Sequence, residues 1–115
     1  MDTDAIGSVP AALFGLDGFR VLAGADAGGE LELMIETTAE LVGCPGCGAV
    51  ARPKDRRPTW VGDLSIAGRP VVLCWVKRVW ECPHRRCPKR TWTERHDAIA
   101  PRAVLTDRAA AAGVA

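Results

Sequence analysis

Two short-spaced cysteine pairs constrain the fold of this chain more than any other feature. Cys44 and Cys47 lie in the segment Cys-Pro-Gly-Cys-Gly, and Cys82 and Cys87 lie in Cys-Pro-His-Arg-Arg-Cys. Two such pairs can supply four thiolates to one tetrahedral metal ion, and glycine or proline beside each pair suits the tight turn that directs both sulfurs inward. The sequence therefore predicts one structural Zn²⁺ site.

A redox pair and a set of disulfides are the alternatives for these cysteines. A thioredoxin-like motif needs only one pair, at the start of a helix in a βαβ unit, and the sequence shows no such pattern. The five cysteines are an odd number and no secretory signal precedes them, which disfavours a disulfide framework. Cys74 has no cysteine two or four residues away and is predicted to be a core thiol. His84 is interpreted as a bystander beside the second pair, and His96 has no evident partner.

The charge is distributed unevenly along the 115 residues. Residues 1–43 contain one base, Arg20, and eight acids, whereas residues 44–115 contain 14 bases and six acids. This asymmetry predicts an anionic partner for the second part of the chain. No stretch approaches the roughly 20 apolar residues of a membrane span, and no targeting signal is evident, so we expect a cytoplasmic protein.

The first part of the chain is predicted to form an acidic β-hairpin. Residues 19–23 have the composition of a short strand, and a turn follows at 26–29. Residues 30–36 alternate, with Leu31, Leu33 and Ile35 on one face and the glutamates on the other. The glutamates are interpreted as a solvated face, because no histidine, serine or third acid accompanies them as a catalytic site would require.

A second hairpin is predicted between the two cysteine pairs, whose inner members are separated by 34 residues. Residues 51–59 are predicted to be a polar, basic loop, and residues 60–66 and 70–81 two strands joined by a turn. Further on, a helix of about twelve residues is predicted from Pro101. The four tryptophans are expected in the core: Trp60, Trp75, Trp80 and Trp92.

Together these elements predict a small, mainly β fold of zinc-ribbon-like antiparallel hairpins tied by one zinc, with an N-terminal β-hairpin and a short C-terminal helix. The expected organisation is a flexible terminus at 1–12, the acidic hairpin at 13–38, the zinc-binding domain at 39–98, and a short helix at 99–115 that begins a truncated helical region. The basic residues around the predicted metal site are the candidates for contact with the phosphates of an anionic partner. They are Arg52, Lys54, Arg56, Arg57, Lys77, Arg78, Arg85, Arg86, Lys89, Arg90 and Arg95.

Several of these segments carry a family resemblance. The order of motifs resembles the N-terminal zinc finger of bacterial insertion-sequence transposases of the ISL-three family. The motifs are Cys44-Pro45-Gly46-Cys47-Gly48, Gly68-Arg69-Pro70-Val71, Lys77-Arg78, Trp80, Cys82-Pro83, Cys87-Pro88 and Thr91-Trp92-Thr93-Glu94, with Ile99-Ala100-Pro101-Arg102 and Leu105-Thr106 after them. The resemblance spans about residues 13–108, which is only the front of a typical member.

The resemblance implies a zinc-dependent part of a transposase that helps it to grip double-stranded DNA at the inverted repeats of the element. In this family a helical DNA-binding segment and a catalytic domain follow, so we expect a truncated chain with no catalytic residue, no transposase activity of its own and no small-molecule substrate. Self-association or association with a full-length transposase is a further expectation. The alternatives are a zinc ribbon that binds proteins rather than DNA, and a thiol redox protein.

Overall fold

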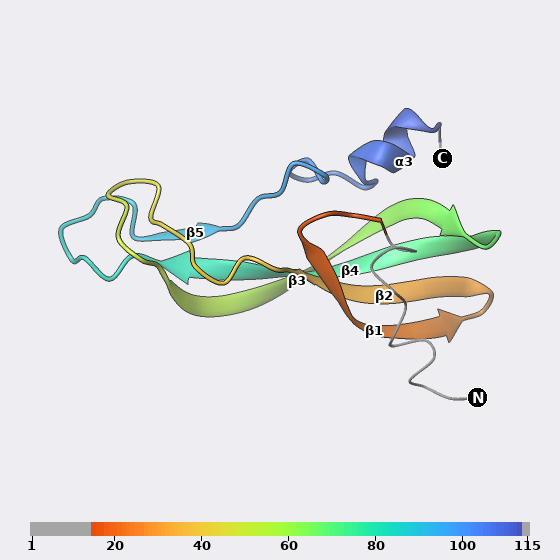
Figure 1. The fold of residues 1–115 in the computed structure, drawn as a ribbon, viewed down its shortest axis with the longest axis horizontal. Helices are drawn as coiled ribbons and strands as arrows, with labels where there is room; N and C mark the ends of the chain where they lie inside the picture. The colour runs from red at the N-terminus through yellow and green to blue at the C-terminus, as the bar shows by residue number, and fades with distance from the viewer. Residues whose placement is uncertain (1–14, 114–115) are drawn as a thin grey trace.

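The computed structural model describes residues 15–113, which form an elongated molecule of 51 × 32 × 22 Å (Figure 1). The predicted flexible terminus at 1–12 lies outside the described residues. The elements are β1 (Phe19–Ala27), β2 (Glu30–Thr37), β3 (Arg52–Ile66), β4 (Arg69–Glu81), β5 (Thr91–Thr93) and the short helix α3 (Asp107–Ala111). The prediction of a small, mainly β fold with one short helix is confirmed.

The N-terminal hairpin of β1 and β2 is also confirmed. Gly28 and Gly29 form its turn with positive φ angles of 63° and 88°, which glycine adopts at little cost. The apolar residues Leu31, Leu33 and Ile35 are buried, as their alternation predicts. Strand β1 continues to Ala27, beyond the predicted end at residue 23, because it pairs along the whole of β2.

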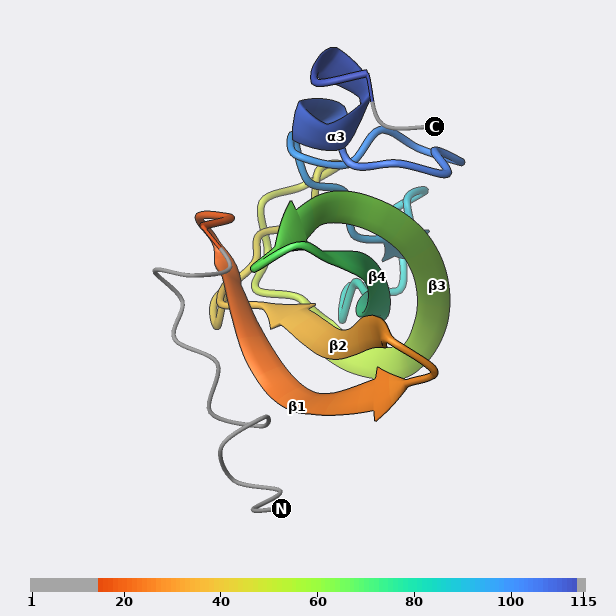
Figure 2. The same ribbon diagram turned by 90° about the vertical axis from the view of Figure 1, so that its right-hand side faces the viewer.

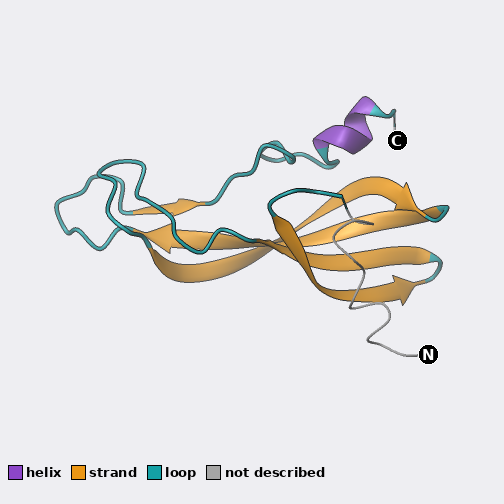
Figure 3. Cartoon of the chain, in the orientation of Figure 1, coloured by secondary structure: helices purple, strands orange, loops and turns teal. Residues whose placement is uncertain are grey.

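The sheet is mixed, with the strand order β1-β2-β4-β3. After β2 the chain runs to the end of the molecule that carries the two cysteine pairs, residues 43–51 and 82–93, which we call the metal end. It returns along β3 and runs out again along β4. Strands β2 and β4 therefore point the same way and pair in parallel (Figure 3). The prediction of antiparallel hairpins alone was therefore incomplete. Strand β5 pairs with the far end of β4, where Trp92 lies opposite Trp80.

Strand β3 occupies the segment that was predicted to be a basic loop. It runs from Arg52 to Ile66 because the edge of β4 is available for antiparallel pairing along almost its whole length. Two prolines, Pro53 and Pro58, favoured the loop prediction, but β3 is an edge strand, where a missing N–H group is tolerated. Tertiary pairing thus overrides the local preference of this segment.

The hydrophobic core lies inside the curled part of the sheet that Figure 2 shows end-on. The ring of Phe19 meets that of Trp75 edge to face, with 5.4 Å between the centroids. Trp75 and Trp80 are buried, as predicted. The prediction is wrong for Trp60, which is 61% exposed on β3, opposite Cys74. Cys74 itself is only half buried, because it lies on the face of β4 opposite the buried Leu73 and Trp75.

The C-terminal helix α3 is shorter than the predicted twelve residues. Its five residues begin after Thr106, whose hydroxyl accepts a hydrogen bond from the N–H group of Ala109. Arg102, which falls inside the predicted helix, has a φ of 61°. Asp63 accepts hydrogen bonds from Thr106 and Arg108 and so holds α3 to β3. No helix among the described residues is long and apolar enough to cross a membrane.

Candidate metal centre

The first cysteine pair lies in a tight turn between β2 and β3. The N–H group of Cys44 donates to the carbonyl of Ala49, and that of Gly48 donates to the carbonyl of Cys44, both at 2.8 Å. The N–H group of Gly46 points to the Cys44 sulfur at 3.3 Å. A Cβ atom on Gly46 would lie 3.1 Å from the Cys87 sulfur, so glycine at this position leaves room for the second pair.

The second pair lies in the connection between β4 and β5. The N–H group of Cys82 donates to the carbonyl of Arg90 at 2.7 Å, and that of Cys87 donates to the carbonyl of His84 at 3.2 Å. Pairing of β5 with β4 therefore closes the turn that carries Cys82 and Cys87.

The four sulfur atoms converge on one point. All of them lie within 4.8 Å of one another. Cys44 Sγ is 3.6 Å from Cys87 Sγ, and Cys47 Sγ is 3.5 Å from Cys82 Sγ. A tetrahedral zinc with Zn–S bonds of about 2.3 Å requires sulfurs roughly 3.8 Å apart, whereas a disulfide requires about 2.05 Å. The geometry fits one four-coordinate metal ion and no disulfide, as the spacing of the pairs predicts.

Cys74 and His84 are not part of this group. The metal-binding group among residues 15–113 consists of the four paired cysteines alone. Three of the four, Cys44, Cys82 and Cys87, are buried. A site with four protein ligands has no open position for substrate, which is typical of a structural zinc.

The environment of the thiols differs between the two turns. Burial raises the pKa of Cys44, but hydrogen bonds from the Gly46 and Cys47 backbone and from the Cys87 and Cys82 thiols outweigh it and lower the pKa to about 7. Burial raises the pKa of Cys82 to about 12, and the neighbouring sulfurs add to this effect. A bound divalent cation favours the thiolate form of all four ligands.

Arg78 connects the metal end to the core. It is 8% exposed and donates to the backbone carbonyls of Ala39 and, at 3.0 Å, of Thr37, in the segment that leads to the first cysteine pair. Glu94, which follows β5, accepts from the N–H group of Arg78 at 2.8 Å and from the hydroxyl of Thr37 at 2.7 Å. Arg78 is among the residues predicted from the sequence to contact phosphates, but in the structure its guanidinium is buried and donates to backbone carbonyls.

Glu36 is the acidic residue beside Arg78. Its carboxylate binds Arg20 at 2.7 Å and Arg56 at 2.6 Å, and lies 3.8 Å from Arg78. Burial raises the pKa of Glu36, but hydrogen bonds from Arg56 and Arg20 outweigh it, so the net shift is downward. The prediction of a solvated glutamate face is therefore wrong for Glu36, while Glu32 is exposed.

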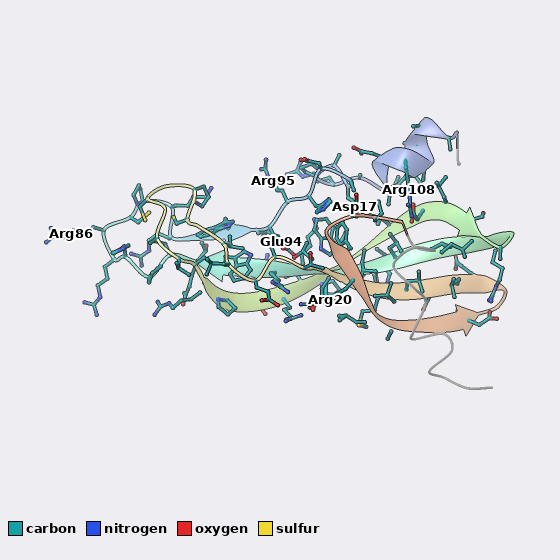
Figure 4. The ribbon with its side chains drawn as sticks, in the orientation of Figure 1. Asp17, Arg20, Arg86, Glu94, Arg95 and Arg108 are labelled. Atoms are coloured by element: carbon teal, nitrogen blue, oxygen red, sulfur yellow. The ribbon has the colours of Figure 1, made fainter. Side chains whose placement is uncertain are left out.

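The remaining residues predicted to contact DNA differ in whether they form ion pairs. Arg52 pairs with Glu81 at 3.3 Å, and Arg56 pairs with Glu36. The others form no ion pair within the described residues: Lys54, Arg57, Lys77, Arg85, Arg86, Lys89, Arg90 and Arg95. Figure 4 shows Arg86 at the extreme metal end and Arg95 nearer the middle of the molecule. His96, expected to have no partner, packs on Phe19 with ring centroids 4.3 Å apart.

Comparison with known proteins agrees with this geometry. Residues 40–88, which include all four ligands, β3 and β4, match the family model of the zinc-finger of transposase IS204/IS1001/IS1096/IS1165. No curated protein and no solved structure matches the chain. The four cysteines are placed for one metal ion, and the matched family makes that ion Zn²⁺. Residues 40–88 thus form a zinc finger of the ISL-three transposase family, in which Cys44, Cys47, Cys82 and Cys87 are placed to bind one zinc ion.

Proposed function

We propose that this protein binds double-stranded DNA through its metal end, as the part of a transposase that recognises the inverted repeats of an element. The observation that carries the proposal is the turn of the second cysteine pair. Residues 82–90 contain four bases, Arg85, Arg86, Lys89 and Arg90, and no acid. All four are exposed, and Arg86 marks the end of the molecule farthest from the core (Figure 4).

The charge of the metal site does not cancel this basic surface. One Zn²⁺ and four thiolates carry a net charge of −2, whereas the four bases carry +4. Lys54 adds a further exposed positive charge on the neighbouring strand β3. The excess of positive charge favours contact with the phosphate backbone, which supplies most of the affinity of such proteins for DNA.

In this proposal the zinc fixes the basic turn in place and takes no part in a reaction. The site has four protein ligands and leaves no position for a reacting water. His84 is exposed beside the site, and His96 packs against Phe19, so neither is paired with a nucleophile. Cleavage and transfer of DNA strands are assigned to other parts of a transposase.

Replacement of the two outermost arginines tests the proposal. Arg85→Gln/Arg86→Gln is expected to weaken binding to a short duplex about tenfold and to lower the salt slope by roughly 0.9 for each phosphate that the protein no longer neutralises. Fluorescence anisotropy with labelled duplex at several salt concentrations measures both. Arg69→Gln, at the opposite end of β4 and paired with Asp26, is the control and should leave the affinity unchanged.

The proposal predicts a steep fall in the affinity of the wild-type protein with salt. Zinc-loaded protein that binds no duplex at low salt would contradict it. Association with a protein partner that is insensitive to salt would instead favour the alternative of a protein-binding zinc ribbon.

A further inference from the structure

An open groove of about 1290 Å³ lies between the metal end and the core. Most of its lining comes from three parts of the chain: residues 37–45 at the end of β2 and after it, the middle of β4, and the segment 89–102 that includes β5. Arg57 on β3 and Gly18 complete the lining. Figure 1 shows the first and the third of these segments beside β4. The exposed arginines of the metal end, Arg85 and Arg86, do not contribute to it.

The groove is strongly basic. Five bases line it, Arg57, Lys77, Lys89, Arg95 and Arg102, and one acid, Glu94. The carboxylate of Glu94 already accepts hydrogen bonds from Thr37 and from the backbone of Arg78. None of the five bases forms an ion pair in the part of the chain that the structure describes, although Arg20, Arg52, Arg56, Arg69, Arg78 and Arg108 all do.

Two of these bases face each other across the sheet. Arg57 on β3 is the direct cross-strand partner of Lys77 on β4. Like charges in this position destabilise a sheet, although the ammonium group of Lys77 lies over the ring of Trp75, 4.7 Å from its centroid. An anion bound in the groove would remove the repulsion. The placement of Arg57 opposite Lys77 therefore indicates an anionic ligand, independently of the total charge of the groove.

The groove also contains an aromatic side chain and several hydroxyl donors. Trp92 is half buried, so part of its ring is accessible, and Thr38, Thr91 and Thr93 are exposed along the lining. A basic groove with an aromatic ring is typical of surfaces that bind single-stranded nucleic acid, where phosphates meet the basic side chains and an unpaired nucleobase stacks on the ring. The nucleobases of a duplex are paired and stacked on one another, so they are not available to Trp92.

We propose that this groove binds a single DNA strand, at a site that shares Lys89 with the duplex-binding turn at 82–90 but none of the arginines of that turn. The inference rests on the proposed function in taking DNA as the partner. Arg57, Lys77, Lys89 and Arg95 contact phosphates in the groove, together with Arg102, which was not among the DNA contacts predicted from the sequence. Trp92 stacks on one unpaired base.

Two matched double variants of the full chain separate the sites. Arg57→Gln/Arg95→Gln removes two groove arginines, and Arg85→Gln/Arg86→Gln removes two from the metal end. Anisotropy with labelled oligothymidine of about 20 nucleotides and with a duplex of the same length measures both affinities. The groove variant is expected to bind the single strand about tenfold more weakly, with its salt slope lowered by roughly 1.4. Its affinity for the duplex should change less than about twofold, and the metal-end variant should show the reverse pattern.

Zinc content and thermal unfolding show that the variants are folded. Arg57→Gln is expected to raise the unfolding temperature of the free protein, because it relieves the repulsion with Lys77. Wild-type protein that binds the duplex but not oligothymidine overturns the groove site and leaves the proposed function standing. Binding of neither probe overturns both. Equal loss of single-strand affinity in the two variants overturns the groove site, because the metal end would then hold the strand.

Discussion

The two ends of this molecule are stabilised in different ways. At the core end, Phe19, Leu33, Ile35, Leu73 and Trp75 are almost completely buried between the curled strands. At the metal end, the buried cluster consists of three cysteines, and the partly buried apolar residues packed against it among residues 15–113 are Ala49 and Trp92. The core end therefore has hydrophobic burial of its own, whereas the metal end depends on the ion that its cysteines bind.

This difference explains how a small domain can carry a dense basic surface. Arginines and lysines repel one another, and a hydrophobic core under them would have to offset both that repulsion and the cost of ordering the loops. Four zinc–thiolate bonds provide this support within two short turns. Arginine and lysine can then occupy four of the seven positions of residues 82–90 that are not cysteine.

The largest expected effect tests whether the metal end depends on zinc. Cys44→Ser is expected to abolish the binding of one zinc per chain and to unfold the two cysteine turns, because structural zinc contributes on the order of 10 kcal/mol in zinc-finger peptides. Metal analysis measures the zinc, and hydrogen exchange measures protection in each region. Protection should be lost at 43–51 and 82–93 and kept in β2 and the first half of β4.

Cys74→Ser is the matched control and should keep the zinc, since Cys74 is outside the metal-binding group. Loss of protection throughout the chain in Cys44→Ser would show that the two ends fold as one unit. Unchanged protection at the metal end would show that zinc is not needed there.

A smaller effect is expected where the two ends are joined. Arg78→Met keeps the volume of the side chain but removes its hydrogen bonds to the carbonyls of Thr37 and Ala39, and leaves Glu36 with less positive charge nearby. Loss of the partners of a buried charged group typically costs about 3 kcal/mol, so we expect the free energy of unfolding of Arg78→Met to fall by this amount. Urea denaturation measures the change.

Arg86→Met, at an exposed position, should change the stability by less than about 0.5 kcal/mol. If Arg78→Met were as stable as the wild type and bound DNA more weakly, Arg78 would be a contact residue after all.

The smallest effect concerns the attachment of α3 at the core end and depends on pH. Burial raises the pKa of Asp63, but hydrogen bonds from Arg108 and Thr106 outweigh it, so its folded-state pKa lies below the ordinary 3.8. Its stabilising contribution is complete above pH 3.8 and is lost as the pH falls through the folded-state pKa.

Asp63→Asn is expected to reduce stability at pH 7 by about 2 kcal/mol and to make the loss of stability below pH 4 less steep. Urea denaturation between pH 3 and pH 7 measures both. Asp97→Asn, at an exposed position, is the control. If the loss of stability at low pH were identical in Asp63→Asn and the wild type, protonation of Asp63 would not contribute to acid unfolding.

The sequence alone determined the metal site and the core face of the N-terminal hairpin. The spacing of Cys44, Cys47, Cys82 and Cys87 specifies ligand type, ligand number and the need for two tight turns, all of which are local properties of the chain. The alternation of Leu31, Leu33 and Ile35 is equally local, because side chains of a strand point to opposite faces in turn.

Only the tertiary structure decided which basic and aromatic residues face solvent. Arg78 and Lys77 are neighbours in sequence, yet one is buried under the backbone of residues 37–39 and the other lines an open groove. Pro53 and Pro58 indicated a loop, but β4 offered a pairing edge to the whole segment. Trp60 is exposed because it lies on the face of β3 that points away from the core, unlike its buried neighbour Val61. In each case the outcome depends on a partner distant in sequence, which composition and periodicity do not specify.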